Sequence, residues 1–200
     1  MDSRWDKSVE EYKNLDNHEV IIGVMGLGVM GGQVAKTLSV LGYPVRGWTR
    51  RKRCADDFQK VELYHGDDQL LHFAASSNIV INLLPLTEST KGILNSSLFN
   101  AMPTGGSILN LARGAHLVAD DLLEALKTGQ LDAAVLDVFV KEPLPPTCPF
   151  WKHEKIRVFP HMSSVTDISN GVDQIIRNRT LILQNKELPH GVLADVVSGY

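Results

Sequence analysis

Residues 20–38 read VIIGVMGLGVMGGQVAKTL: an apolar run, a glycine-rich turn and a stretch with helical spacing. The turn, GLGVMG at residues 26–31, matches G-x-G-x-x-G, and its place between a predicted strand and a predicted helix is typical of dinucleotide-binding proteins. In such a turn Gly26 permits the tight bend, Gly28 lets the backbone approach a pyrophosphate, and Gly31 lets the helix pack closely on the strand. A structural turn without a ligand is the alternative, because glycine is common in turns.

The rest of the chain alternates between strands and helices without internal repeats. Apolar runs predict strands at residues 20–25, 44–49, 61–65, 79–83, 107–111, 133–139 and 156–159. Helices are expected at residues 30–41, 67–75 with Asp67 as N-cap, 97–102, 120–128 ending at Gly129, and 167–185; the proline-rich residues 142–150 are expected to form a loop. Near-continuous apolar strands suit a parallel sheet that is covered on both faces. We therefore predict an α/β fold, a doubly wound parallel sheet of the Rossmann type.

The composition is that of an ordinary globular chain, with 200 residues of which 44% are hydrophobic and 22% charged. No stretch approaches the roughly 18 apolar residues that span a bilayer. Residues 1–19 are rich in acids and lack the apolar core of a leader peptide, so we expect a cytoplasmic protein without a membrane partner. The net charge of −3 argues against nucleic acid as a partner. Cys54 and Cys148 lie far apart, so neither a disulfide framework nor a metal site is expected.

A basic run, RGWTRRKR at residues 46–53, includes the end of the second predicted strand and the loop after it. Domains that prefer NAD usually carry an acidic residue about 20 positions after the first glycine, where it binds the ribose hydroxyls. Here Thr49, Arg50 and Arg51 stand near that position, and guanidinium groups bind phosphate oxygens through two parallel hydrogen bonds. We therefore expect NADP to be preferred over NAD. A solvated basic loop or a small nucleic-acid patch is the alternative.

Three chemically complementary side chains follow later predicted strands: Arg113 in NLARG, Glu142 in KEPLP and His161 in FPHMSS. Ligands of open α/β sheets bind at this edge. Reduction of a 2-oxo acid needs a cation for the substrate carboxylate, a proton donor that titrates near neutral pH, and a partner that keeps the donor protonated. Arg113, His161 and Glu142 suit these three tasks. Asp137, a polar residue in an apolar strand, could accept a hydrogen bond from the nicotinamide amide.

Each of these residues taken alone could be a surface charge or a packing residue, and the combination is what favours a site. The remaining histidines have no comparable setting and are expected at the surface: His18, His65, His72, His116, His153 and His190.

At these residues the chain resembles the D-isomer-specific 2-hydroxyacid dehydrogenases, most closely their glyoxylate/hydroxypyruvate reductase branch. The similar segments, which fall within residues 20–200, are GLGVMG, INLLPLTEST, ILNLARG, LDVFVKEPLP, PFWKHEKIRVFPH and the terminal GY. The resemblance implies that Arg113 anchors a small 2-oxo acid and that His161 is the acid/base, with Glu142 as its partner. It also implies a homodimer. The cofactor contacts that it implies are Leu27, Gly28, Val29, Met30, Thr49, Arg50, Arg51, Leu84, Pro85, Leu111, Ala112 and Asp137.

The family places a substrate domain on the order of 100 residues before the dinucleotide domain, and this sequence shows no counterpart of it. We expect residues 1–19 to be a linker from that domain, 20–165 the dinucleotide-binding domain, and 166–200 a helix and tail that in the family packs on the substrate domain. A catalytically weak or inactive NADP-binding or dimerisation module is therefore an alternative function. The β-hydroxyacid dehydrogenases of the 3-hydroxyisobutyrate type are another, but they need a long helical second domain for which the chain has no room.

Overall fold

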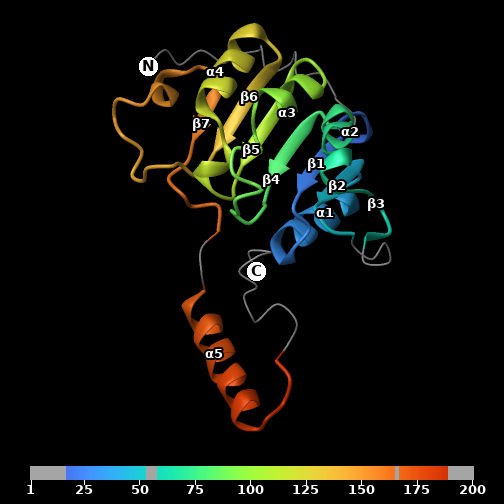
Figure 1. Ribbon diagram of the computed structural model, residues 1–200, viewed down its shortest axis with the longest axis vertical. Helices are drawn as coiled ribbons and strands as arrows, with labels where there is room; N and C mark the ends of the chain where they lie inside the picture. The colour runs from blue at the N-terminus through green and yellow to red at the C-terminus, as the bar shows by residue number, and fades with distance from the viewer. Residues whose placement is uncertain (1–16, 53–57, 165–166, 189–200) are drawn as a thin grey trace, which may run out of the picture.

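The structure, a computed structural model, describes residues 17–52, 58–164 and 167–188, and its main feature is a parallel sheet of seven strands (Figure 1). The strands are β1 Ile22–Met25, β2 Val45–Thr49, β3 Val61–His65, β4 Ile79–Asn82, β5 Gly106–Asn110, β6 Leu131–Leu136 and β7 Ile156–Val158. Their order in the sheet is β3-β2-β1-β4-β5-β6-β7, and every neighbouring pair is parallel. The predicted Rossmann-type fold is confirmed.

The order of the strands reverses between β1 and β4, which is where open α/β sheets bind their ligands. The register aligns the carboxyl ends of the central strands, because Met25 pairs with Asn82, Asn82 with Asn110, and Asn110 with Leu136. The segments that follow β1, β4, β5 and β6 therefore start from the same edge of the sheet.

Helices cover both faces of the sheet. They are α1 Val29–Val40, α2 Leu70–Ala75, α3 Ser96–Ala101 and α4 Ala119–Thr128. One core cluster joins α1 to the strands through Val24, Leu27 and Ala35. A larger cluster on the other face includes Phe73, Leu98 and Leu122, from α2, α3 and α4 respectively. Helix α1 thus lies alone among these helices on its face. Strand β5 alternates between buried and half-buried residues.

Most element boundaries agree with the sequence prediction to within two residues, with three corrections. Strand β6 begins and ends earlier than expected, so 137–139 is irregular. Asp67 is not an N-cap: the 3-10 turn η4 Asp67–Gln69 follows Gly66, and Gln69 precedes α2. The proline-rich segment ends in another 3-10 turn, η6 Pro149–Lys152, because proline is well tolerated at the first helical position.

The last helix, α5 Ile168–Leu183, begins after Asp167, whose side chain caps it by accepting from Asn170 N at 3.2 Å. The helix projects away from the sheet (Figure 1), and none of its residues is buried. Its exposed apolar residues are Ile168, Val172, Ile175, Ile176, Ile182 and Leu183. The apolar face of α5 was expected to pack on another surface, and within the described part of the chain it does not.

No described helix combines the length and apolar character that a membrane span requires.

Candidate active site

The glycine turn, residues 26–31, has the geometry that its sequence predicted. Gly26 has a φ of +91°, and a Cβ there would lie 2.9 Å from the main-chain oxygen of Leu83. A Cβ on Gly31 would lie 1.8 Å from the main-chain oxygen of Gly26, so only glycine lets the helix start this close to the strand. The side chain of Leu27 is buried against Gly47, which leaves its main chain as the part that can face a ligand.

The first turn of α1 is open to solvent. Gly28 is its N-cap in an extended conformation and offers no side chain to the first N–H groups. Val29 and Met30 follow with 93% and 54% of their surface exposed. Free N–H groups and the positive end of a twelve-residue helix suit the phosphates of a dinucleotide. The residues present therefore fit the cofactor.

The basic loop, residues 50–52, starts where β2 ends. Thr49 is buried and its hydroxyl donates to Arg51 O at 2.8 Å, which folds the loop back on the strand. Arg50 donates from Nη1 to the hydroxyl of Ser89, and this bond connects the segments that follow β2 and β4. Arg51 is exposed. Arg53, also part of the predicted basic run, lies outside the described residues, as do Cys54 and His190.

The segment after β4, residues 83–94, will be called the proline turn. Leu84 is buried in the larger core cluster. The main-chain oxygen of Pro85 accepts the hydroxyl of Thr90 at 2.7 Å and lies 3.2 Å from Nε2 of His116. The Thr90 hydroxyl and the His116 ring therefore hold the Pro85 main chain, which is expected to contact the cofactor.

The segment after β5, residues 111–118, will be called the anchor loop. A buried amide pair holds its start, because Asn82 Nδ2 donates to Asn110 Oδ1 at 3.0 Å and Asn110 Nδ2 donates to Arg113 O at 3.0 Å. Leu111 is half-buried and Ala112 buried. Arg113 itself is exposed and donates from Nη1 to Ala112 O at 2.6 Å. No carboxylate among the described residues pairs with this guanidinium.

Gly114 brings the anchor loop against the segment that carries Glu142. A Cβ on Gly114 would lie 2.0 Å from the carbonyl carbon of Phe139 and 2.3 Å from Val140 N. Phe139 N in turn donates to Glu142 Oε1 at 2.8 Å. The main chains that carry the predicted anchor and the predicted carboxylate are therefore in contact.

Glu142 and His161 form the direct pair that their sequence positions suggested. His161 Nδ1 lies 2.8 Å from Glu142 Oε2. The hydrogen bond from His161, followed by that from Phe139 N, lowers the pKa of the Glu142 carboxyl below its ordinary value of 4.5. A carboxylate that is ionised at neutral pH can hold a proton on Nδ1 and stabilise the imidazolium, and Nε2 is then the ring nitrogen that can exchange a proton with a ligand.

Asp137 has a contact that the sequence did not reveal. It lies just after β6, is 2% exposed, and accepts Met162 N at 2.8 Å on one oxygen and Ser163 N at 3.1 Å on the other. These bonds hold the turn in which His161 adopts a φ of +52°, a conformation that is uncommon without glycine. Both oxygens of Asp137 are thus already engaged by main-chain donors.

Sequence reasoning missed three polar residues beside the site. Asn82, Asn110 and His116 are each 0% exposed. The expectation that His116 lies at the surface was wrong, because the 3-10 turn η5 Gly114–His116 folds the ring under the proline turn. The only available signal was a polar residue near the end of an apolar strand, for the two asparagines, or three positions from a predicted site residue, for His116.

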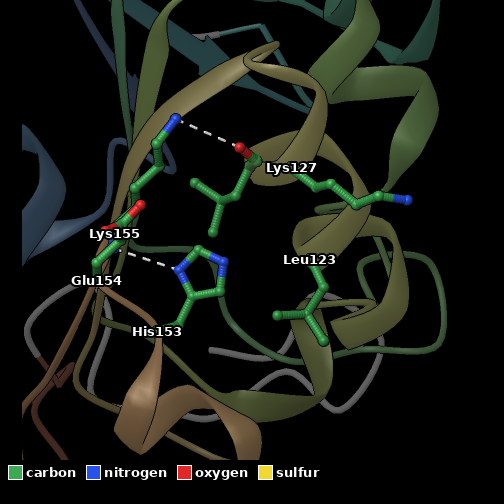
Figure 2. Close-up of a pocket in the computed structure, with 6 residues that line it drawn as sticks. Leu123, Lys127, His153, Glu154 and Lys155 are labelled. Carbon is green, nitrogen blue, oxygen red and sulfur yellow. Dashed lines mark hydrogen bonds between the residues drawn. The ribbon is translucent and has the colours of Figure 1, made fainter.

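A shallow hollow of about 490 Å³ lies at the opposite edge of the sheet, between the end of α4 and the start of β7 (Figure 2). His153 and Lys155 line it, but Lys155 Nζ lies 3.4 Å from Leu126 O, and the side chain of Lys127 points away from both. The cations therefore do not converge on one point. No group of three or more metal-ligating side chains occurs within the described part of the chain.

Comparison with known proteins agrees with this geometry. The family model of the D-isomer specific 2-hydroxyacid dehydrogenase NAD-binding domain matches residues 1–163. A glyoxylate/hydroxypyruvate reductase A from Serratia proteamaculans is 44% identical over 194 residues, which are 96% of this chain and 60% of that protein. A second reductase of this name, from Photorhabdus laumondii, is also 44% identical, with 98% and 60% covered. The chain thus spans about 60% of the length of these relatives.

Solved structures of proteins from the same family also resemble this chain. A D-isomer specific 2-hydroxyacid dehydrogenase from Xanthobacter autotrophicus, in complex with NADPH and MES, has a TM-score of 0.84 at 35% identity, with 91% of this chain and 73% of that chain covered. An NADPH-dependent glyoxylate/hydroxypyruvate reductase from Sinorhizobium meliloti, in complex with NADP and sulfate, has a TM-score of 0.83 at 34% identity, with 90% and 57% covered.

Proposed function

Because the chain belongs to the D-isomer specific 2-hydroxyacid dehydrogenase family, we propose that it binds NADPH and reduces a small 2-oxo acid of the glyoxylate or hydroxypyruvate type. The observation that carries the proposal is the 2.8 Å hydrogen bond between Glu142 and His161 at the edge where the glycine turn opens. The two solved relatives, which hold NADPH and NADP, support the choice of cofactor. NAD is expected as the weaker alternative.

The cofactor, when bound, supplies the hydride. The chain's own residues then have separate tasks. Arg113 binds the substrate carboxylate through its guanidinium fork, which fixes the carbonyl carbon in one orientation. His161 gives the proton on Nε2 to the carbonyl oxygen, and Glu142 stabilises the imidazolium before that transfer. The glycine turn and the start of α1 bind the pyrophosphate, and Arg50 and Arg51 bind the 2'-phosphate.

Replacement of His161 by alanine tests this assignment. Loss of general acid catalysis typically costs 10²- to 10⁴-fold in rate, so glyoxylate-dependent oxidation of NADPH should fall by at least about 100-fold. NADPH affinity, measured by fluorescence, should change less than about threefold, because no cofactor phosphate is expected to contact His161. His72→Ala, at an exposed histidine on α2, is the matched control and should keep both properties.

A catalytically weak or inactive NADP-binding module is the second candidate. The observation that favours it is that α5 has no buried residue. Turnover separates the candidates, since the module should bind NADPH without oxidising it in the presence of glyoxylate. The homodimer and the cytoplasmic location stay predictions, which cross-linking and cell fractionation can test.

A further inference from the structure

His116 is a buried histidine that neither the substrate nor the cofactor is expected to touch. It follows Arg113 by three positions, is 0% exposed, and has Nε2 3.2 Å from Pro85 O. A carbonyl oxygen can only accept, so Nε2 must carry the proton. We propose that His116 is a positioning residue, which fixes the anchor loop against the proline turn so that Arg113 and the cofactor-contacting Leu84–Pro85 peptide keep one relative position. The proposal rests on the proposed function.

Main-chain hydrogen bonds join the far ends of these two segments. Gly92 N donates to Ala115 O at 3.0 Å, and Leu94 N donates to His116 O at 2.9 Å. Val118 N then donates back to Leu94 O at 3.0 Å, which completes a short parallel bridge between Leu94 and Leu117. The anchor loop is therefore paired with the end of the proline turn.

The near ends are joined by the buried amides. Asn82 and Asn110 pair across β4 and β5, and Asn110 holds the main chain of Arg113. The His116 ring, whose main chain belongs to the far-end attachment, reaches back to Pro85 O near the start of the proline turn. Loss of that link would let the two segments separate at Pro85 and would weaken the main-chain bonds at their far ends, one of which His116 O accepts.

The chemistry of the ring supports a role beyond packing. Nδ1 is buried and makes no hydrogen bond of ordinary geometry among the described residues, although the nearby Arg113 main chain acts to raise the pKa of the ring. An unpaired buried nitrogen costs free energy, and an apolar ring of similar volume would fill the space without that cost. The bond from Nε2 to Pro85 O is the interaction that an apolar ring could not replace.

The test compares His116→Phe, which keeps the ring and removes the donor, with His116→Gln, whose amide nitrogen can reach the position of Nε2. His72→Gln is the control. Hydrogen exchange of the Gly92, Leu94 and Val118 amides measures how firmly the anchor loop is attached to the proline turn. Kinetics with glyoxylate and NADPH measure how this attachment affects substrate binding. A buried hydrogen bond is typically worth about tenfold in an equilibrium. His116→Phe should therefore speed exchange and raise KM for glyoxylate, each about tenfold, with less change in kcat, and His116→Gln should restore both.

Unchanged exchange in His116→Phe, or a glutamine variant as defective as the phenylalanine variant, would overturn the proposal. An exchange effect with an unchanged KM would also overturn it, because the link would then be only structural. If His116→Phe prevents folding, His116→Asn takes its place, since the shorter amide cannot reach Pro85 O. Absence of turnover in the unmodified chain would overturn the proposed reaction instead, and exchange and NADPH affinity would then decide the role of His116.

Discussion

At the scale of the residue, burial sets the charge of His116. Desolvation is the largest cause that lowers the pKa of His116 below its ordinary value of 6.5, and the nearby Arg113 guanidinium acts in the same direction. The main-chain oxygens of Pro85 and Arg113 act against it and are weaker. The ring is therefore neutral in the folded protein at pH 7. Its single proton is on Nε2, which donates to Pro85 O.

This charge state predicts a loss of stability in mild acid. Above pH 6.5 the ring is mostly neutral in both folded and unfolded chains. As the pH falls below 6.5 the unfolded chain binds a proton that the folded chain resists, so the free energy of unfolding falls by up to about 1 kcal/mol between pH 6.5 and 5.5. Urea denaturation at both pH values should show this loss in the unmodified chain and not in His116→Phe. Equal losses in both would exclude His116 as the cause.

Arg50 and Arg51 decide the cofactor preference if the basic loop binds the 2'-phosphate. A hydrogen bond to a charged group is worth about 1.5–3 kcal/mol, so exchange of both arginines for glutamine should weaken NADPH binding at least about tenfold. NADH binding should change little, because NADH lacks that phosphate. Fluorescence titration with both cofactors measures the ratio, and an unchanged ratio would discard the phosphate contact. Lys91→Gln, at an exposed residue of the proline turn, is the control for removing a positive charge outside the basic loop.

At the scale of the element, the site depends on how closely the anchor loop approaches the segment that carries Glu142. Gly114→Ala would place a methyl group 2.0 Å from the Phe139 carbonyl carbon, which backbone atoms cannot tolerate without moving. We expect it to displace Glu142 and to cost roughly 1–3 kcal/mol of stability, as overpacking does, with loss of turnover. Gly171→Ala in α5 is the matched control, because nothing lies within 4 Å of its Cβ position. Thermal denaturation and glyoxylate reduction measure both effects, and equal behaviour of the two variants would contradict the prediction.

Local signals explain why much of the fold could be predicted. The glycine turn, the apolar strands and the end of α4 at Gly129 each depend on residues adjacent in sequence. The pair Glu142–His161 followed from the rule that parallel strands end at one edge. The burial of His116 and the Asn82–Asn110 pair could not be predicted in this way, because each needs a partner about 30 residues away. Asp137 was assigned to the cofactor as a polar residue in an apolar strand, and its bonds to main-chain donors 25 and 26 residues further on could not be predicted from that signal.

At the scale of the whole molecule, the chain divides into a packed sheet domain and a helix that contributes nothing to its core. Both core clusters of the described residues lie between residues 24 and 156, whereas Ile175 and Ile176 on α5 are 68% and 58% exposed. Six apolar side chains along one exposed helix are more than a monomeric surface usually leaves uncovered. Stability of the sheet domain and association of the chain should therefore respond to different residues.

Two variants separate these properties. Exchange of Ile175 and Ile176 for glutamine should change the free energy of unfolding by no more than about 0.5 kcal/mol per site, as exposed positions do. The same change should shift sedimentation towards the monomer, because it removes apolar surface that favours association. Leu122→Ala, at a core residue of α4 with 0% exposure, should cost about 2–5 kcal/mol and leave association unchanged below the unfolding transition. A double glutamine variant as unstable as Leu122→Ala would mean that α5 packs on the sheet domain in solution, because only buried side chains lose that much.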